Sequence, residues 1–221
     1  MPPIARPRAL LTALLLGACS GGSSTGSSNM TSSPVTASPA SAPAHRLAIG
    51  PNAAETDVSS IVGKPAPGWN LTTWLNGPPR RLADLRGQVV LVRWFMSSEC
   101  PYCNATAPAL VKLDDTYAAR GLTIVGMYHH KSETPLVVAD VKKLVDEHYR
   151  FRFPVAIDDD WKTLKTWWLD DHPKSWTSVS FLVDRAGTVR YAHLGGEYPV
   201  GSDDYAQMQA WIDELLAERR G

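Results

Sequence analysis

The stretch VVLVRWFMSSECPYC, residues 89–103, joins an apolar run to two cysteines that are separated by two residues. A continuous run of this length, rich in β-branched and aromatic side chains, is typical of a strand that is covered on both faces. Helix-forming sequence follows the first cysteine and ends before Gly121. Cysteines at the exit of a strand, spaced by one helical turn, can switch between a dithiol and a disulfide. We therefore expect the chemistry of the chain at Cys100 and Cys103.

The amino terminus predicts export and lipidation. Two arginines precede a short apolar run, residues 9–16, which is too short to span a bilayer as a helix. The run ends in LGAC, residues 16–19, which resembles a bacterial lipobox. Residues 1–18 are thus expected to be a lipoprotein signal peptide, with Cys19 as the site of lipid attachment. A plain secretory peptide with a coincidental cysteine is the alternative.

The rest of the chain divides into two expected parts. Residues 19–60 contain the lipidated cysteine and a tract rich in Ser, Thr, Pro and Gly, which is expected to be a flexible tether. Residues 61–221 are expected to form one folded domain. An anchored protein of this kind works outside the cytoplasm, on the periplasmic side in a Gram-negative cell, where disulfides persist. The chain carries no net formal charge, which gives no indication of nucleic acid as a partner.

Apolar runs alternate with amphipathic segments along the domain, and this order predicts an α/β sandwich with a mixed sheet. Strands are expected at residues 69–74, 88–95, 122–128, 154–157, 179–183 and 188–192. Helices are expected at residues 101–119, at 135–149 with Thr134 as N-cap, from Asp159 or Asp160 through Trp168, and at 203–220.

Several motifs resemble those of one superfamily. They are GKPAP at residues 63–67, LADLRGQVVLV at 82–92, WFMSSECPYC at 94–103, Pro108 in the following helix, and SFLVDRAG at 180–187. Together they resemble the thioredoxin-like superfamily, in particular the extracytoplasmic TlpA/ResA-like thiol–disulfide oxidoreductases and their AhpC/TSA-type relatives. The resemblance implies a thioredoxin-like three-layer α/β/α sandwich with a mixed central sheet and an N-terminal β extension.

The cysteine pair has distinct expected roles. Cys100 should lie at a helix N-terminus, where free backbone N–H groups and the helix dipole favour its thiolate. Cys100 is then the nucleophile that attacks a substrate disulfide, and Cys103 resolves the mixed disulfide. Pro101 suits the first helical position, and Tyr102 is expected to tune the reduction potential.

The sequence departs from the superfamily's pattern at three neighbours of the pair. Glu99 stands where a tryptophan often precedes the first cysteine, and it adds a negative charge. Thr106 stands where a glutamate commonly lies near the second cysteine, which removes a proton acceptor. Ser178, in the segment before Phe181, stands where thioredoxins place a cis-proline, which makes the site more similar to that of peroxiredoxins.

These observations predict a membrane-anchored thiol–disulfide oxidoreductase without a cofactor, with a protein disulfide or dithiol as substrate and a second protein as redox partner. A redoxin-type thiol peroxidase is one alternative. A structural disulfide is another, but a bond that closes so small a loop constrains the unfolded chain little. A third alternative is a copper or zinc chaperone that uses the cysteines with His129, His130 or His172, although each histidine is more simply a solvated loop residue.

Overall fold

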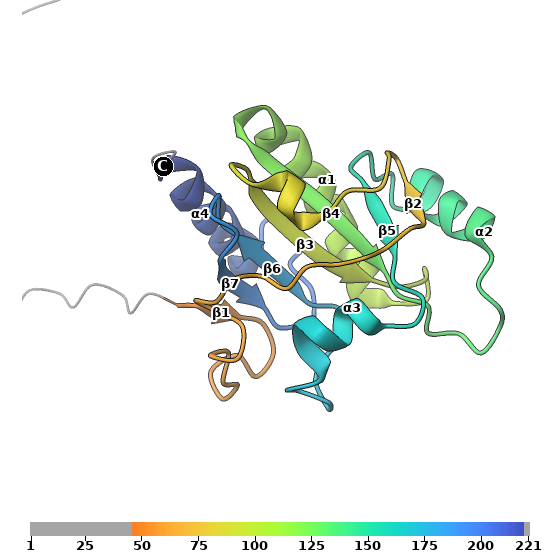
Figure 1. Cartoon of the computed structure of the whole chain (residues 1–221), viewed down its shortest axis with the longest axis horizontal. Coiled ribbons are helices and arrows are strands. Elements are labelled where there is room, and N and C mark those ends of the chain that lie inside the picture. The colour runs from red at the N-terminus through yellow and green to blue at the C-terminus, as the bar shows by residue number, and fades with distance from the viewer. Residues whose placement is uncertain (1–45, 219–221) are drawn as a thin grey trace, which may run out of the picture. The chain divides into compact units, whose positions relative to one another are not determined.

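The computed structural model describes residues 46–218, which form a seven-stranded sheet with helices on both faces (Figure 1). The strand order is β1-β7-β6-β3-β4-β5-β2. The strands are β1 (Ala48–Ile49), β2 (Trp74–Leu75), β3 (Val89–Phe95), β4 (Leu122–Tyr128), β5 (Val155–Ile157), β6 (Ser180–Val183) and β7 (Val189–His193). The α-helices are α1 (Pro101–Tyr117), α2 (Val138–Lys143), α3 (Lys162–Leu164) and α4 (Asp203–Ala217). Shorter turns of other helix types are η1 (Leu82–Leu85), η2 (Ala118–Arg120), η3 (Leu144–His148) and η4 (Lys165–Leu169).

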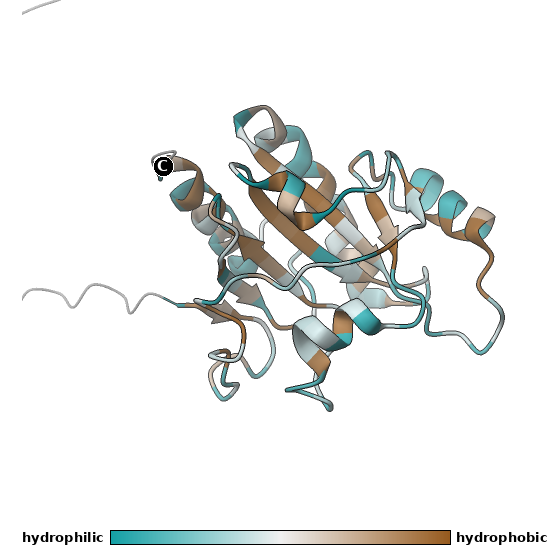
Figure 2. Cartoon of the chain, in the orientation of Figure 1, coloured by the Kyte–Doolittle hydropathy of each residue, from teal (hydrophilic) through white to brown (hydrophobic). Residues whose placement is uncertain are grey.

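The apolar run that precedes the cysteines forms the centre of the sheet. β3 pairs in parallel with β4 and antiparallel with β6, so the sheet is mixed as expected. All seven residues of β3 are buried, and Figure 2 shows β3 and β4 as mostly hydrophobic ribbons. A strand buried on both faces requires apolar side chains on both, which explains the continuous run.

Two hydrophobic clusters lie on the opposite faces of the sheet. One contains inward side chains of α1, α2 and α4, such as Leu110, Val141 and Ile212. The other contains the side chains of η1 and of the α3–η4 segment, such as Leu82 and Trp167. The cysteines belong to the first cluster, so α1 carries them down onto the sheet rather than out into solvent.

The sheet includes residues that precede the expected start of the domain at residue 61. Ala48 and Ile49 form β1, which pairs in parallel with β7 at the sheet edge. The expected signal peptide, Cys19 and most of the expected tether lie outside the described residues. Within residues 46–218, no helix is both long enough and apolar enough to cross a membrane.

Two expected elements are shorter than the sequence pattern predicts. Of the strand expected at residues 69–74, only Trp74 lies in a strand, β2. Trp69 instead donates its indole N–H to the carbonyl of Arg80 at 2.7 Å and joins the core. The helix expected from residue 135 begins at Val138. The Thr134 hydroxyl pairs with Ser132 at 2.9 Å instead of capping the helix, so the prediction of Thr134 as N-cap is wrong.

The prediction that Asp159 or Asp160 caps the next helix is also incomplete. The principal cap is Asp158, a buried carboxylate that accepts from the backbone N–H groups of Thr163 at 3.0 Å and Leu164 at 2.8 Å. Asp158 also accepts from the Trp94 indole at 3.1 Å. One side chain therefore joins the central strand to the start of α3, while exposed Asp160 accepts from the backbone N–H of Lys162 at 3.1 Å and pairs with the ammonium of the same residue at 2.7 Å.

Replacement of Asp158 by alanine is expected to lower the free energy of unfolding by about 3 kcal/mol, because three buried donors lose their acceptor. Urea denaturation followed by tryptophan fluorescence measures this change. Asp159→Ala is the matched control, because Asp159 is exposed. Equal stability of the two variants would contradict the assignment of Asp158 as the buried link.

Candidate active site

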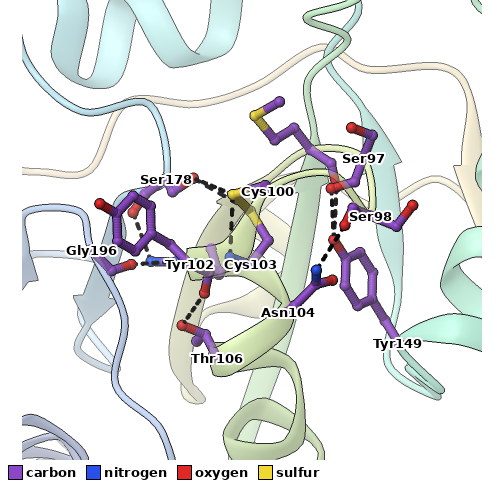
Figure 3. The surroundings of a disulfide bond; sticks show 12 residues. Ser97, Ser98, Cys100, Tyr102, Cys103, Asn104, Thr106, Tyr149, Ser178 and Gly196 are labelled. Atoms are coloured by element: carbon purple, nitrogen blue, oxygen red, sulfur yellow. Dashed lines mark hydrogen bonds between the residues drawn. A yellow bond between two sulfur atoms is a disulfide. The ribbon is translucent and has the colours of Figure 1, made fainter.

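The two cysteines lie at the start of α1, which follows β3 in the chain, and they form a disulfide with Cα atoms 5.3 Å apart (Figure 3). Cys100 is the N-cap of α1, and its Sγ accepts from the backbone N–H of Cys103 at 3.2 Å. Pro101 occupies the first helical position as expected. The sulfur of Cys100 thus receives a backbone N–H and the positive end of a helix of 17 residues, and both favour its thiolate after reduction.

The two sulfurs are largely shielded from solvent. Cys100 is 7% exposed and Cys103 is 3% exposed, so Cys100 is the more accessible of the two. Glu99 is exposed to solvent beside them. Solvent screens an exposed carboxylate, so the negative charge of Glu99 opposes formation of the Cys100 thiolate only weakly.

Ser178, which immediately precedes the strand segment leading into β6, contacts both cysteines. Its hydroxyl oxygen lies 3.5 Å from Sγ of Cys103 and 3.9 Å from Sγ of Cys100 (Figure 3). Ser178 is 5% exposed. A hydroxyl therefore faces the sulfurs at the position where a cis-proline was noted to be missing, and after reduction it can donate to a thiolate.

Thr106 is fully buried, and its hydroxyl is already engaged. It donates to the carbonyl of Tyr102 at 2.8 Å and accepts from the backbone N–H of Tyr198 at 3.4 Å. A neutral, hydrogen-bonded hydroxyl cannot take a proton from a cysteine at neutral pH. The expectation that this position lacks a proton acceptor is therefore consistent with its surroundings.

The loop before the cysteines is held by a side chain of α1 and by one that follows η3. Tyr149 donates to the carbonyls of Met96 at 3.1 Å and Ser97 at 3.0 Å. Burial raises the pKa of Tyr149, so its hydroxyl stays a donor. Asn104 donates to the carbonyl of Ser98 at 2.7 Å, and the sequence patterns indicated neither contact.

An aromatic pair borders the disulfide on its exposed side. Tyr102 and Trp176 are each 37% exposed, and their rings meet edge to face with centroids 5.3 Å apart. Trp176 comes from the segment that precedes Ser178, whereas Tyr102 lies between the cysteines. The residue between the cysteines thus forms part of a partly exposed aromatic pair.

The three histidines that were considered as metal ligands lie in different surroundings. His130 bonds to the Tyr128 hydroxyl at 3.1 Å, and His172 stacks on Trp168 with ring centroids 3.7 Å apart. His129 is fully buried rather than solvated, so the simpler expectation for it is wrong. Within residues 46–218, no group of three or more His, Cys, Asp or Glu side chains is placed to hold a metal ion.

A buried arginine near the cysteines was missed by the sequence patterns. Arg93 lies in β3, is 0% exposed, and donates to the carbonyl of Ser178 at 2.7 Å. The only sequence signal was a single charge in the middle of the apolar run VVLVRWF.

The sheet, the helix that begins at the first cysteine and the disulfide between residues 100 and 103 define a class, the thioredoxin-like thiol–disulfide oxidoreductases. Residues 62–192 match the AhpC/TSA family, and the chain belongs to that family. Its TlpA/ResA-like character is confirmed by the family match and by similar sequences.

Two named relatives are similar over most of the domain. The chain is 29% identical over 154 residues to the thiol-disulfide oxidoreductase ResA of Bacillus anthracis, covering 70% of this chain and 78% of the relative. It is 28% identical over 158 residues to the thiol:disulfide interchange protein DsbE of Pseudomonas fluorescens biotype C, covering 71% and 80%.

A solved structure confirms the thioredoxin-like fold. The crystal structure of a thiol-disulfide isomerase from Corynebacterium glutamicum superposes with a TM-score of 0.56 at 24% identity, covering 71% of this chain and 99% of that one.

Proposed function

We propose that the protein is a membrane-anchored, extracytoplasmic thiol–disulfide oxidoreductase that acts through Cys100 and Cys103. The observation that carries the proposal is the position of Cys100 at the N-terminus of α1, where its sulfur accepts from the backbone N–H of Cys103. Cys100 is also the more exposed residue of the two. The names of the ResA and DsbE relatives agree with the proposed activity.

The proposed reaction consists of two thiol–disulfide exchanges that can run in either direction, and a substrate disulfide is reduced when they run in the following order. The thiolate of Cys100 attacks a disulfide of a protein substrate, and the leaving sulfur departs as a thiolate that takes a proton. Cys103, one helical turn further along α1, then attacks Cys100 and releases the substrate as a dithiol. A redox partner protein restores the starting state by the same exchange, and no cofactor is needed.

The anchor belongs to the proposal as well. Cys19 lies outside the described residues, and the support for its lipidation is the LGAC sequence at residues 16–19. Lipid chains on Cys19 would hold the enzyme at a membrane surface, with the following residues giving it reach.

The test is reduction of insulin disulfides by the full chain, with dithiothreitol as electron source, compared with dithiothreitol alone. The wild-type protein is expected to accelerate the reaction, and protein alkylated after reduction is expected to give only the background rate. Cys19→Ser is the matched control, because it removes the third cysteine of the chain. It should keep the exchange rate and move from the membrane fraction to the soluble fraction, whereas an unaccelerated wild-type reaction would refute the proposed activity.

A second candidate, a redoxin-type thiol peroxidase, is favoured by the AhpC/TSA match. Hydrogen peroxide would oxidise Cys100 to a sulfenate, and Cys103 would condense with it to give the observed disulfide and water. Peroxide consumption faster than insulin reduction, with trapped sulfenate on Cys100, would replace the first candidate by the second.

A further inference from the structure

Arg93 brings a positive charge into the core without a negative partner. Its guanidinium is 0% exposed, and its Nε has no hydrogen-bond partner within the described residues. Its acceptors are all neutral: the Ser178 carbonyl at 2.7 Å, the Ser180 hydroxyl at 3.3 Å and the Gly196 carbonyl at 3.4 Å. An isolated buried charge is costly, and guanidinium does not lose its proton in proteins. The buried positive charge of Arg93 is therefore expected to have a functional role.

The titratable groups around this guanidinium do not neutralise it at pH 7. They are Tyr149, Tyr198, His129 and His193. Burial raises the pKa of both tyrosines and lowers the pKa of both histidines, so all four are uncharged. The Tyr198 ring lies 5.4 Å from the guanidinium carbon, which contributes a cation–π contact but no charge. Across residues 46–218, no carboxylate forms an ion pair with Arg93.

A single residue separates the guanidinium from the disulfide. Ser178 accepts from Arg93 through its carbonyl at 2.7 Å, and its hydroxyl lies 3.5 Å from the sulfur of Cys103. Figure 3 shows Ser178 against the sulfurs, with Gly196 on the same side. Arg93 therefore lies beneath the redox pair in a region of low exposure, where charges act over longer distances than in water.

We propose that Arg93 supplies the counter-charge for the thiolate that reduction creates, and that it thereby makes the pair a better oxidant of substrate dithiols. The inference rests on the proposed function and adds the direction in which electrons flow, from substrate to enzyme. In the oxidised protein the guanidinium has no counter-charge, whereas in the reduced protein the thiolate provides one, so reduction of the enzyme is favoured. Arg93 acts through Ser178 and is a positioning residue rather than a reacting one.

The oxidised pair meets a substrate dithiol, and two electrons pass from the substrate sulfurs to Cys100 and Cys103. The substrate gains a disulfide bond, the enzyme's disulfide breaks, and Cys103 keeps one proton as a thiol. Cys100 remains a thiolate facing the field of Arg93, and the second proton goes to solvent.

The test compares wild type with Arg93→Met, which removes the charge, and Arg93→Lys, which keeps it. Thiolate absorbance at 240 nm gives the pKa of Cys100, and equilibration with reduced and oxidised glutathione gives the reduction potential. Arg93→Met is expected to raise the Cys100 pKa by about one unit and to shift the equilibrium about tenfold toward the disulfide, which is about 30 mV for two electrons. Arg93→Lys is expected to restore most of both changes.

Arg190→Met is the matched control, because Arg190 is already paired with Asp184 at 3.3 Å and Glu218 at 2.8 Å. Unchanged pKa and potential in Arg93→Met would overturn the inference, even with disulfide exchange intact. Should Arg93→Met fail to fold, a wild-type Cys100 pKa near the ordinary value for a thiol would overturn it too. Absorbance needs no substrate, so failure of the proposed activity in the insulin assay is a separate result.

Discussion

Cys103→Ser is expected to stop turnover and to leave Cys100 joined to its substrate as a lasting mixed disulfide. A serine hydroxyl at that position does not ionise at neutral pH, so it cannot displace the substrate sulfur from Cys100. Cys103 is 3% exposed and lies behind Cys100, so solvent thiols would replace it poorly. We expect turnover to fall on the order of 1,000-fold, as for loss of a reacting group in other enzymes.

The matched variant is Cys100→Ser, which should lose turnover to the same degree without forming the adduct. Both variants are first reduced and then mixed with a substrate protein that carries an activated disulfide, and non-reducing electrophoresis with intact-mass spectrometry measures the adduct. Near-stoichiometric adduct on Cys103→Ser alone is the expected result. Adduct on Cys100→Ser instead would show that the two cysteines exchange the proposed roles.

The centre of the fold could be predicted because local sequence and burial agree there. The run at residues 89–95 needs apolar side chains on both faces, and only a central strand provides that environment. The helix after the cysteines was predictable for the same local reasons, since Cys100 and Pro101 suit its first positions. Hairpin strands β6 and β7 likewise fell at the expected residues within one position.

The errors arose where specific side-chain contacts, one local and one long-range, override the preference of a residue for a helix start. Thr134 and Pro135 form a good local helix start, yet the helix begins at Val138 because the preceding loop makes its own bonds. Asp158, Asp159 and Asp160 are equivalent as caps in the sequence, and only the indole of Trp94 makes the first one the buried link.

Within the site, the cysteine pair could be predicted from the sequence, but the residues that pack around the two sulfurs could not. Ser178 contacts both sulfurs although it lies 75 positions beyond Cys103 in the sequence. No local sequence pattern indicates a contact over such a separation. Arg93 did leave a signal, because a charge inside a buried strand demands an explanation. The sequence does not indicate which part of the folded protein interacts with this charge.

His129 is expected to make the protein lose stability as the pH falls below about 6.5. Its ring is 0% exposed, and neither ring nitrogen has a hydrogen-bond partner in the described part of the chain. The ring packs edge to face on Trp161, with centroids 4.8 Å apart. Burial, with smaller contributions from nearby positive charges, lowers the pKa of His129 to about 3.

The sign of the effect follows from where the proton binds. Between pH 6.5 and about 3, the unfolded chain protonates this histidine while the folded protein does not. The unfolded state therefore gains protons as pH falls, and stability decreases across that window. The loss attributable to His129 should be about 2 kcal/mol at pH 5 and on the order of 4 kcal/mol near pH 3.

The measurement is the free energy of urea unfolding at pH 7.5, 6, 5 and 4 for wild type and His129→Phe. The variant keeps an aromatic ring against Trp161 but has nothing to protonate. Its stability relative to wild type should rise by about 2 kcal/mol between pH 7.5 and pH 5. Carboxylates and the buried His193 titrate in both proteins, so their contributions cancel in the difference. Parallel curves for His129→Phe would contradict this prediction, because they would mean that the buried ring accepts a proton in the folded protein as readily as in the unfolded chain.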